Sequence, residues 1–342
     1  MKLDAALPRA PLADVPAIAT AAEAIGFAAI WTSETYHDPF LPHALIAEHT
    51  SRIHSGTGIA VSFSRSPTTI AYTAWDLAAQ SNGRFILGLG TQVKAHIERR
   101  FGMEWPASVT GKLREQIQVM RALWDTWQTG APLNFRGEYY KITLMSPFFN
   151  PGPIDHPEIP IYIAGVNPGL ARLAGEMCDG FLIHPFHTPG YLREIMLPAI
   201  LQGAGKSGRT REDISMAASV FTAADDDELE ACRQSISFYA STPSYRPVLE
   251  HHGWLEVGKK LSSLAARGQW QDMPALITDD ILAEFCIQAE NPTGMAAAIK
   301  KRYEEGPSTG SGGPLADRIT PYPPFFPDDK DDFWRGLVKA FQ

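Results

Sequence analysis

Two side chains that could transfer protons, Glu34 and His37, lie three residues apart in the segment SETYHDPF. The segment follows Phe27 to Thr32, an apolar run typical of a buried parallel strand. A carboxylate and an imidazole can each act as general acid or base, and partial enclosure at a strand end shifts their pKa values. We predict that Glu34 and His37 are the acid–base residues of this chain. His184 follows another apolar run and is a further candidate, unless hydrogen bonds simply hold it in place.

A second polar segment, GTQVKAHIERR, follows the apolar run Phe85 to Leu87. Before it stands a glycine pair, Gly88 and Gly90, that suggests a dinucleotide-binding turn. The corresponding fingerprint, GxGxxG, requires a third glycine at a position that is Val93 in this chain. The Rossmann fingerprint is therefore excluded. The two glycines either let a planar ligand approach the backbone or merely relieve crowding at the rim of a barrel.

Basic side chains gather in the same segment, at Lys94, Arg99 and Arg100, although the chain as a whole is acidic. With 38 acidic and 30 basic residues, its formal net charge is −8, so the overall field repels nucleic acid and anionic membrane surfaces. A local cationic cluster in such a chain can bind an anionic part of a ligand. We predict this role for Lys94, Arg99 or Arg100, and a solvated helix face is the alternative.

The segment Gly165, Val166 and Asn167 lies between an apolar run and a predicted helix. Asn167 is a favourable helix cap, and Pro168 suits the first helical position. Free backbone N–H groups and the helix dipole at such a point attract phosphate. The segment is therefore a candidate anion site, and an ordinary strand-to-helix turn is the alternative.

Residue spacing does not favour metal or disulfide chemistry. The ten histidines include no HxH or HExxH pattern. The three cysteines lie far apart and form no CxxC pair. We expect no metal site, and three buried thiols in a reducing cytosol.

Charged residues near the amino end, at Asp4, Arg9, Asp14 and Glu23, interrupt the apolar core that a signal peptide needs. The chain also has no run of about 20 apolar residues that could cross a bilayer. We expect a cytoplasmic protein with neither a membrane nor a nucleic-acid partner.

The candidate residues all follow predicted strands, and these strands alternate with amphipathic helices. The pattern gives eight strand–helix units, with strands predicted at residues 2–7, 27–32, 59–63, 85–87, 159–164, 180–184, 214–222 and 318–322. An eight-fold parallel repeat closes into a (β/α)8 TIM barrel with its active site at the carboxyl ends of the strands. We therefore predict an α/β fold with one barrel domain over residues 1–342.

Two stretches interrupt the repeat. At about residues 130–157, alternation from Asn134 to Thr143 predicts a hairpin, and the prolines that follow exclude a helix. At about residues 243–313, the sequence is helical but out of step with the repeat, and it ends in a Ser- and Gly-rich tether at 308–313. We predict that both stretches are insertions on the barrel rim.

Taken together, these segments resemble the bacterial luciferase-like monooxygenase superfamily, in particular its actinobacterial branch that uses the deazaflavin coenzyme F420. The resemblance covers nearly the whole chain and rests on SETYHDPF, GLGTQVKAHIERRFG, the FRGEYY hairpin and IYIAGVNPGLARLAGEMCDGF. The most specific pieces are GTQVKAHIERRF and AGVNPGLARLAGEMCDG. The resemblance implies a TIM barrel with a flavin or deazaflavin lying across its mouth.

The resemblance also implies roles around the cofactor ring. Glu34 matches the acid that contacts the polar edge of the ring, and Gln92 and His96 match positions that face the ring and the substrate. Thr35 occupies a cofactor-contacting position at which relatives often have histidine. This departure makes His37 the substitute candidate for proton transfer.

Relatives have a non-proline cis peptide after the third strand that bulges against the ring. By resemblance this bond would lie within Ala60 to Phe63, so Val61, Ser62 and Phe63 are expected beside the cofactor. Such a bond costs about 3 to 4 kcal/mol in a peptide and therefore suggests a functional reason.

The remaining implied contacts concern the ring face and the tail of the cofactor. Gly90 admits a flat ring, and Gly165, Val166 and Asn167 match the phosphate loop. The tail of F420 carries a phosphodiester and glutamates, and an anionic tail suits Lys94 and Arg99.

The activity implied by the resemblance is hydride transfer between F420 and a small organic substrate. A deazaflavin moves hydrides and resists oxygen chemistry, so the protein needs to supply orientation and one acid or base. Two alternatives stay open: an FMN-dependent luciferase-like monooxygenase with a separate reductase, and a deazaflavin-binding protein without catalysis. Barrels of this family commonly dimerise, so we expect a homodimer.

Overall fold

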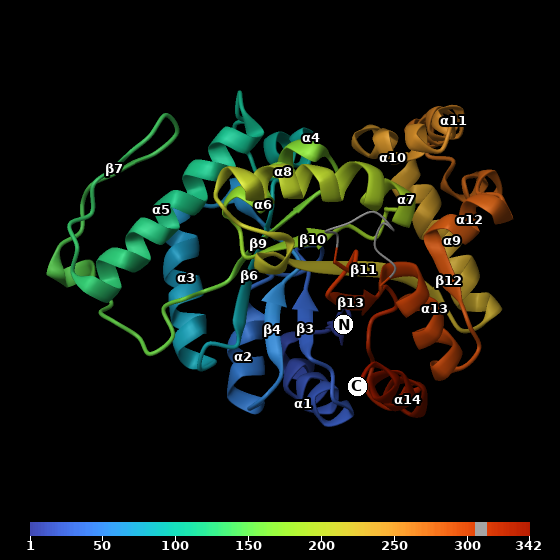
Figure 1. Cartoon of the computed structure of the whole chain (residues 1–342), viewed down its shortest axis with the longest axis horizontal. Coiled ribbons are helices and arrows are strands. Elements are labelled where there is room, and N and C mark those ends of the chain that lie inside the picture. Colours follow the sequence, from blue (N-terminus) through green and yellow to red (C-terminus); the bar gives the residue numbers. More distant parts are fainter. Residues whose placement is uncertain (305–312) are drawn as a thin grey trace.

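The computed structural model describes residues 1–304 and 313–342, and its centre is a parallel sheet curled into a barrel (Figure 1). The strands of this sheet are β1 (Lys2–Leu3), β2 (Ala5–Ala6), β3 (Ala29–Thr32), β4 (His54–Thr57), β5 (Ala60–Val61), β6 (Phe85–Gly90), β9 (Ile161–Gly165), β10 (Gly180–Ile183), β11 (Ser215–Ala223), β12 (Cys286–Gln288) and β13 (Arg318–Pro321). Their apolar residues point into the core because the sheet is covered on its outer face by helices.

The barrel closes through the amino terminus. β1 pairs with β13 and β2 pairs with β3, so residues 2–6 join the two edges of the sheet. Between these edges the order is β13, β11, β10, β9, β6, β4 and β3, with parallel pairing throughout. In the described part of the chain the strands thus occupy eight positions around the barrel. The predicted TIM-barrel fold is confirmed.

Helices return the chain from one end of the barrel to the other, as parallel pairing requires. The Asn167 side chain accepts a hydrogen bond from the Leu170 N–H, so the predicted cap of α6 is confirmed, and the Ser66 side chain caps α3 in the same way by accepting one from the Thr69 N–H. The helices are α1 (Val15–Ile25), α2 (Leu41–His49), α3 (Pro67–Gln80), α4 (Lys94–Arg99), α5 (Val109–Thr129), α6 (Pro168–Met177), α7 (Pro189–Tyr191), α8 (Leu197–Lys206), α9 (Asp226–Ala240), α10 (Arg246–His251), α11 (Leu255–Ala266), α12 (Asp279–Phe285), α13 (Pro292–Glu304) and α14 (Asp331–Phe341).

The third strand of the barrel is irregular. The sequence predicts it at residues 59–63, whereas the structure divides it into β4 and β5. Gly56 of β4 pairs with Ile86, and Ala60 of β5 pairs with Leu89, so the third strand holds one residue more than β6 between the two pairings. This extra residue makes a β-bulge, which turns the strand and redirects the residues after it.

A non-proline cis peptide bond lies inside this bulge, between Gly58 and Ile59. The expected location within Ala60 to Phe63 is therefore wrong. The peptide precedes β5 because the bulge begins directly after Thr57, earlier than the predicted strand.

The interior of the barrel is filled by side chains, in an apolar cluster of Ala29, Trp31, Ile86, Tyr162, Leu182 and Ala217. At the amino-terminal end of the strands the fully buried Asp4 carboxylate accepts hydrogen bonds from Arg318 Nε at 2.7 Å and Arg318 Nη2 at 2.8 Å. Trp31 Nε1 donates to the same carboxylate at 2.8 Å. This ion pair joins the first and last strands of the barrel.

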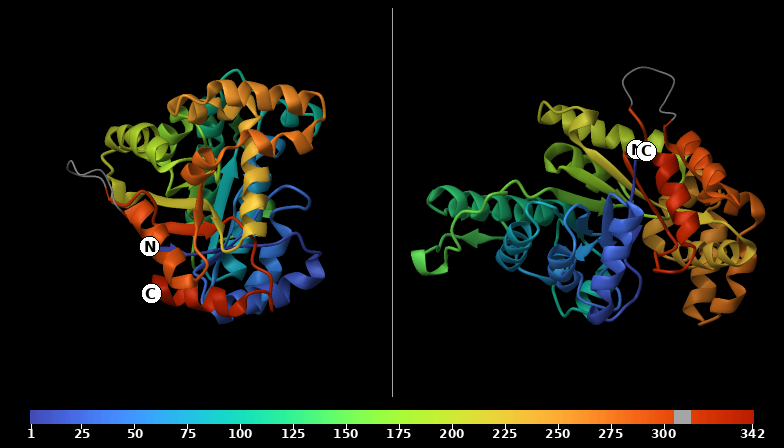
Figure 2. Two further views of the ribbon diagram at one scale, coloured as in Figure 1. Left: turned by 90° about the vertical axis from the view of Figure 1, so that its right-hand side faces the viewer. Right: turned by 90° about the horizontal axis from the view of Figure 1, so that it is seen from below.

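The predicted hairpin is present as β7 (Phe135–Arg136) and the antiparallel β8 (Lys141–Ile142). Figures 1 and 2 both show it extending away from the barrel beyond α5. The predicted tether at 308–313 falls almost entirely on residues 305–312 and so lies outside the described residues.

The chain after β11 departs from the predicted repeat. The helix predicted beside the seventh strand, α9, does pack against β11 and also contacts α11, while α13 packs beside α14 (Figure 1). β12 pairs with Phe221 to Ala223 at the carboxyl end of β11, and the sequence pattern does not predict this short strand. Tyr239 of α9 contacts His184, which directly follows β10, so α9 reaches the carboxyl-end rim of the barrel. The organisation into one domain with two insertions stays a prediction.

Candidate active site

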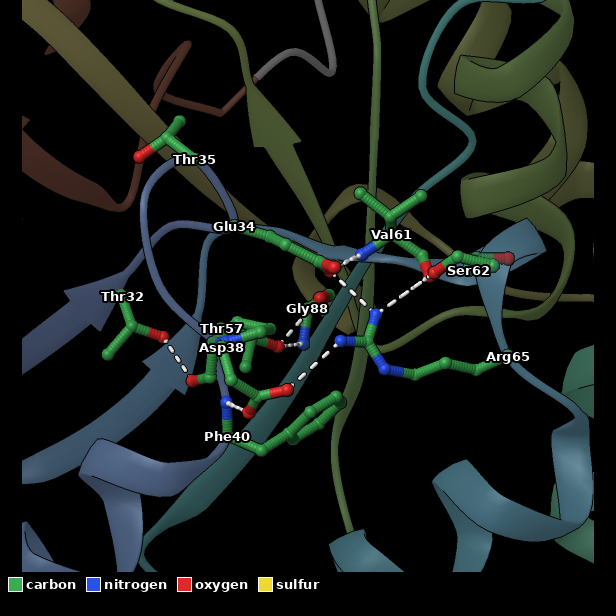
Figure 3. Close-up of polar contacts among 12 residues, drawn as sticks. Thr32, Glu34, Thr35, Asp38, Phe40, Thr57, Val61, Ser62, Arg65 and Gly88 are labelled. Carbon is green, nitrogen blue, oxygen red and sulfur yellow. Dashed lines mark hydrogen bonds and ion pairs between the residues drawn. The ribbon is translucent and has the colours of Figure 1, made fainter. Parts of the chain in front are cut away.

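Glu34 follows β3 at the carboxyl-end rim, and one oxygen of its carboxylate is firmly held (Figure 3). Oε2 accepts hydrogen bonds from the Val61 backbone N–H at 2.6 Å and from Arg65 Nη1 at 2.7 Å. The side chain is 6% exposed, and no other described residue donates a hydrogen bond to Oε1. A carboxylate with one fixed and one unused oxygen is oriented to accept a hydrogen bond or a proton from a ligand.

Arg65 joins the carboxylates of Glu34 and Asp38. Its Nη2 lies 3.2 Å from Asp38 Oδ2, and Asp38 Oδ1 accepts hydrogen bonds from the backbone N–H groups of Phe40 at 2.8 Å and Leu41 at 3.2 Å. Burial acts to lower the pKa of Arg65, but the hydrogen bond and charge of Glu34 and the charge of Asp38 outweigh it and raise that pKa. Arg65 therefore stays cationic and holds Glu34 in one orientation.

The loop that carries Glu34 rests on a buried polar layer. Thr32 Oγ1 donates its hydrogen to the Pro39 carbonyl at 2.7 Å, so the same oxygen accepts from His43 Nε2 at 3.0 Å. Burial lowers the pKa of His43 to about 3, which leaves the ring neutral with its proton on Nε2. Thr32 thus joins the two ends of the loop, and His43 holds the Thr32 hydroxyl in place.

Packing between neighbouring strands accounts for both glycines of β6. A Cβ on Gly88 would lie 1.8 Å from the Thr57 carbonyl oxygen, and a Cβ on Gly90 would lie 2.7 Å from Ile59 Cγ1. The Thr57 hydroxyl also donates to the Gly88 carbonyl at 2.7 Å and accepts from the Gly88 N–H at 2.9 Å. These contacts are those expected of glycines that relieve crowding, and a role of Gly90 beside a cofactor ring stays a prediction.

The residues after the bulge contribute backbone rather than side chains to the rim. Ser62 is fully buried and its hydroxyl donates to Gln116 Oε1 at 2.6 Å, while Phe63 packs edge-on against Trp105 at 6.0 Å. Val61 is also fully buried but directs its N–H to Glu34. The Ser62 hydroxyl therefore faces α5, whereas Phe63 packs against the segment before α5, and contact of either residue with a cofactor stays a prediction.

The polar residues after β6 lie on the surface of the rim. Gln92 adopts a positive φ of 59° and is half-buried, and its side-chain oxygen accepts from the Val93 N–H at 3.0 Å. His96 and Arg99 on α4 are exposed, and Lys94 is exposed and forms an ion pair with Glu98 at 3.7 Å. Exposed cations at this point are available to a charged ligand.

Gly165 and Val166 are half-buried at the end of β9, and Asn167 is exposed at the start of α6. The Val166 carbonyl accepts a hydrogen bond from the Tyr191 hydroxyl at 2.9 Å, which fixes the turn. β9 is the neighbour of β6 in the barrel, so this turn lies beside the segment that carries Gln92.

His184 is held by hydrogen bonds through both ring nitrogens. Nδ1 accepts from the Phe186 N–H at 3.1 Å, and Nε2 lies 3.1 Å from the Tyr245 hydroxyl. Behind it, His187 Nδ1 donates to the His184 carbonyl at 2.7 Å, and its Nε2 accepts from the Tyr303 hydroxyl at 2.7 Å. Burial lowers the pKa of His184 to about 3 and that of His187 to about 4, so both rings are neutral at pH 7.

Contacts connect several of the predicted residues. Glu34 and Val61 are hydrogen-bonded, and Arg100 Nη2 donates to the Thr35 carbonyl at 3.2 Å, which ties the end of α4 to the loop after β3. The exposed His37 forms no hydrogen bond or ion pair with another described residue. Its role as proton donor stays a prediction.

Two residues that position Glu34, Arg65 and Asp38, are absent from the sequence-based candidates. Two local signals point to them: an arginine directly before the helix cap Ser66, and an aspartate two residues before Phe40 in a turn that opens α2. Neither signal shows that the two side chains meet, because that depends on how β3 and the bulged third strand pair.

Other features of the described residues do not compete with this site. Residues 1–304 and 313–342 contain no group of three His, Cys, Asp or Glu side chains placed to hold a metal ion, and none of their helices is long and apolar enough to cross a membrane. A surface hollow at the amino-terminal end of the barrel is lined by Lys2, Arg211 and Asp317 among others. TIM-barrel enzymes place their chemistry at the other end, where Glu34 lies.

A parallel barrel with eight strand positions and helices on its outer face defines the TIM-barrel class. Within this class, residues 2–309 match the model of the luciferase-like monooxygenase family, and the chain belongs to that family. The family resemblance predicted from the sequence is confirmed.

Individual proteins are similar to this chain in sequence or in fold. The chain is 44% identical over 312 residues to an uncharacterized protein of Mycobacterium tuberculosis, covering 89% of this chain and 90% of that protein. It is 30% identical to an F420-dependent glucose-6-phosphate dehydrogenase of Amycolatopsis mediterranei, covering 86% of each. Its fold matches the solved F420-dependent tetrahydromethanopterin reductase of Methanopyrus kandleri with a TM-score of 0.79 at 22% identity, over 99% of this chain and 97% of that one.

Proposed function

We propose that this protein is an F420-dependent oxidoreductase that transfers a hydride between the deazaflavin and a small organic substrate. The observation that carries the proposal is Glu34, with Oε2 fixed by Val61 and Arg65 and Oε1 unused among the described residues. An F420-dependent relative at 30% identity over 86% of the chain supports the choice of cofactor.

The residues at the rim fit a flat ring with a polar edge. Ile59 and Ala164 are half-buried apolar side chains packed on the cluster that fills the barrel, so they offer a flat apolar floor. Glu34 Oε1 stands beside this floor as an acceptor for ring N–H groups. The turn at Gly165 to Asn167, at the amino end of α6, suits a phosphodiester, and the exposed Lys94 and Arg99 suit an anionic tail.

In this proposal a bound deazaflavin supplies a carbon centre that accepts or donates a hydride. Glu34 orients the ring and holds or releases a proton at Oε1, while Arg65 keeps Oε2 from rotating into that role. Arg65 is itself kept in place by Asp38. The exposed His37 is proposed to exchange the substrate proton with solvent, and His96 to face the substrate from α4.

The proposal is tested by fluorescence titration of the purified protein with F420 and with FMN. We expect a micromolar or tighter Kd for F420 and much weaker binding of FMN. Glu34→Gln should weaken F420 binding, whereas Glu158→Gln, an exposed carboxylate far from the rim, should not. Tighter binding of FMN would favour the FMN-dependent monooxygenase, and tight F420 binding without hydride exchange to any acceptor would favour a non-catalytic binding protein.

The role of the cationic residues has its own test. Arg99→Glu should weaken binding of F420 but leave binding of a tail-less deazaflavin ring unchanged, because only the tail is anionic. Equal weakening for both ligands would remove Arg99 from the tail site.

The expected homodimer and cytoplasmic location complete the proposal. Leu144 and Phe148, which follow the hairpin, are 79% and 88% exposed, and a second copy of the chain would cover such apolar surface. Light scattering of the purified protein measures the oligomeric state directly.

A further inference from the structure

Four half-buried rings form a wall at the carboxyl-end rim, made of His184, Tyr239, Tyr245 and Tyr322. The His184 ring stacks on Tyr245 at 4.7 Å and meets Tyr239 edge-on at 4.8 Å. Tyr239 also meets Tyr322 edge-on at 6.4 Å, and their hydroxyl oxygens are 3.2 Å apart. His184 directly follows β10 and Tyr322 directly follows β13, so the wall stands where strands end.

This aromatic wall lies across the mouth from Glu34. Among the described strands, β10 is the fourth position from β3 in either direction around the barrel: through β4, β6 and β9, or through the first strand, β13 and β11. A residue directly after β10 therefore faces one directly after β3 over the width of the mouth. A substrate between them would contact the wall on one side and the ring-binding side of Glu34 on the other.

The hydrogen positions at His184 leave one donor free. Because Nδ1 accepts the Phe186 N–H and burial keeps the ring neutral, the single ring proton is on Nε2. Nε2 therefore donates to the Tyr245 oxygen, and the Tyr245 hydroxyl hydrogen has no acceptor among the described residues. Burial raises the pKa of Tyr245 to about 12, so this hydrogen is present throughout the neutral range.

The pair of Tyr239 and Tyr322 leaves a second donor. One of the two hydroxyl groups donates to the other across 3.2 Å, and the hydrogen of the accepting hydroxyl has no acceptor among the described residues. Burial raises the pKa of Tyr239 well above its usual value, so it too stays protonated. The wall thus combines flat apolar faces with two hydroxyl donors and no charge on its four rings.

We infer that the substrate is an uncharged, planar compound with a conjugated carbonyl, such as an enone or a quinone, bound against this wall. The rings stack on the planar substrate, and the spare hydroxyl hydrogens bind its carbonyl oxygen. This inference rests on the proposed function. For an enone, the β-carbon would accept a hydride from bound reduced deazaflavin, which would lose two electrons, and the α-carbon would take a proton from solvent, so that the C=C bond is reduced.

Binding measured without cofactor tests the inference. Calorimetric titration of the full chain with 2-methyl-1,4-naphthoquinone should give saturable binding. Tyr245→Phe and the double variant Tyr239→Phe/Tyr322→Phe should each weaken it about threefold to tenfold, as loss of one hydrogen bond predicts. Tyr72→Phe is the matched control, since its hydroxyl donates to the Phe149 carbonyl outside the wall. All three variants should bind F420 with unchanged Kd, which also reports that they are folded.

Unchanged quinone affinity in both wall variants would overturn the inference, and so would tighter binding of glucose 6-phosphate than of the quinone, since a dianion finds no partner on the four rings. Failure of F420 to bind, with quinone binding intact and sensitive to Tyr245→Phe, would instead overturn the proposed function and leave the wall as a binding site. The two failures are therefore distinguishable.

Discussion

The two ends of the barrel each hold a carboxylate bound by an arginine. They differ in whether the carboxylate keeps an oxygen available to a ligand. At the amino-terminal end, both oxygens of Asp4 are used, by Arg318 and by Trp31, and the Asp4 side chain is fully buried. At the carboxyl end, Arg65 and the Val61 N–H hold only Oε2 of Glu34.

The comparison separates stability from function within one fold. A buried ion pair with every oxygen satisfied fixes the meeting of the first and last strands and has no capacity for a ligand. A carboxylate with one spare oxygen keeps its orientation and can still bind. In TIM barrels the amino-terminal face serves stability and the carboxyl-terminal face serves chemistry, and the role proposed for Glu34 follows that division.

The largest expected effect comes from removing the Asp4 carboxylate at the amino-terminal end of the barrel. Asp4→Ala leaves the Arg318 guanidinium buried and unpaired, and we expect it to lower the free energy of unfolding by about 3 to 5 kcal/mol in urea denaturation. Glu256→Ala, which removes an exposed partner of Lys259, is the control and should be neutral. A small effect of Asp4→Ala on the free energy of unfolding would mean that the stability of the amino-terminal end does not depend on this ion pair.

Removing the Glu34 carboxylate at the carboxyl end should have the opposite effect: a large loss of activity and little loss of stability. Glu34→Gln is expected to slow hydride transfer by at least about 100-fold, because a general acid–base group typically contributes that much, while unfolding in urea is nearly unchanged. The measurement is the rate at which a quinone acceptor oxidises reduced F420, alongside denaturation of the same sample. If Glu34→Gln destabilised the fold as Asp4→Ala does, the division between the two ends would fail.

Low pH should lower the free energy of unfolding through His43 and His187, which are both buried and neutral at the carboxyl end of the barrel. Burial lowers the pKa of His43 to about 3 and that of His187 to about 4, so the unfolded chain binds more protons than the folded one below about pH 6.5. The two histidines therefore cost no stability above that pH. Below it the free energy of unfolding falls, by about 2 kcal/mol per histidine at pH 5.

The pH effect is measured by urea denaturation at pH 7 and pH 5. His187→Gln should remove about 2 kcal/mol from the difference between the two pH values, whatever it does to stability at pH 7. His96→Gln, at an exposed histidine of α4, should leave the difference unchanged. An identical pH difference in wild type and His187→Gln would contradict the assignment.

The smallest effect is expected from Asp38, which acts on Glu34 only through Arg65. Asp38→Asn weakens a partly exposed ion pair and should lower kcat about threefold to tenfold with KM unchanged. Asp14→Asn, whose side chain forms no capping hydrogen bond, is the matched control. A change in KM alone would mean that Asp38 contacts the substrate and does not position Glu34.

Sequence patterns predict the parts of this molecule that depend on local chemistry. The alternation of apolar strands and amphipathic helices predicts the barrel, and the caps at Ser66 and Asn167 are readable because a cap involves residues three positions apart. Placing Glu34 at a strand end also follows from local pattern.

The features that the pattern does not predict depend on pairing between distant segments. The bulge between β4 and β5 exists only relative to β6, and the ion pair of Arg65 with Glu34 exists only once that bulge has turned the chain. The pairing of β12 with β11 and the contact of α9 with α11 likewise join segments that are distant in the sequence.

The bulge also has a consequence for how this segment tolerates mutation. Backbone N–H groups alternate in direction along a strand, so deleting one residue between Thr57 and Val61 would restore regular pairing with β6 and turn the Val61 N–H away from Glu34. Many substitutions in the same stretch would leave that direction intact. The number of residues between Thr57 and Val61 is thus a stricter requirement than their identity. In a deletion scan, removing one of these residues should have the same effect on function as removing the Glu34 carboxylate.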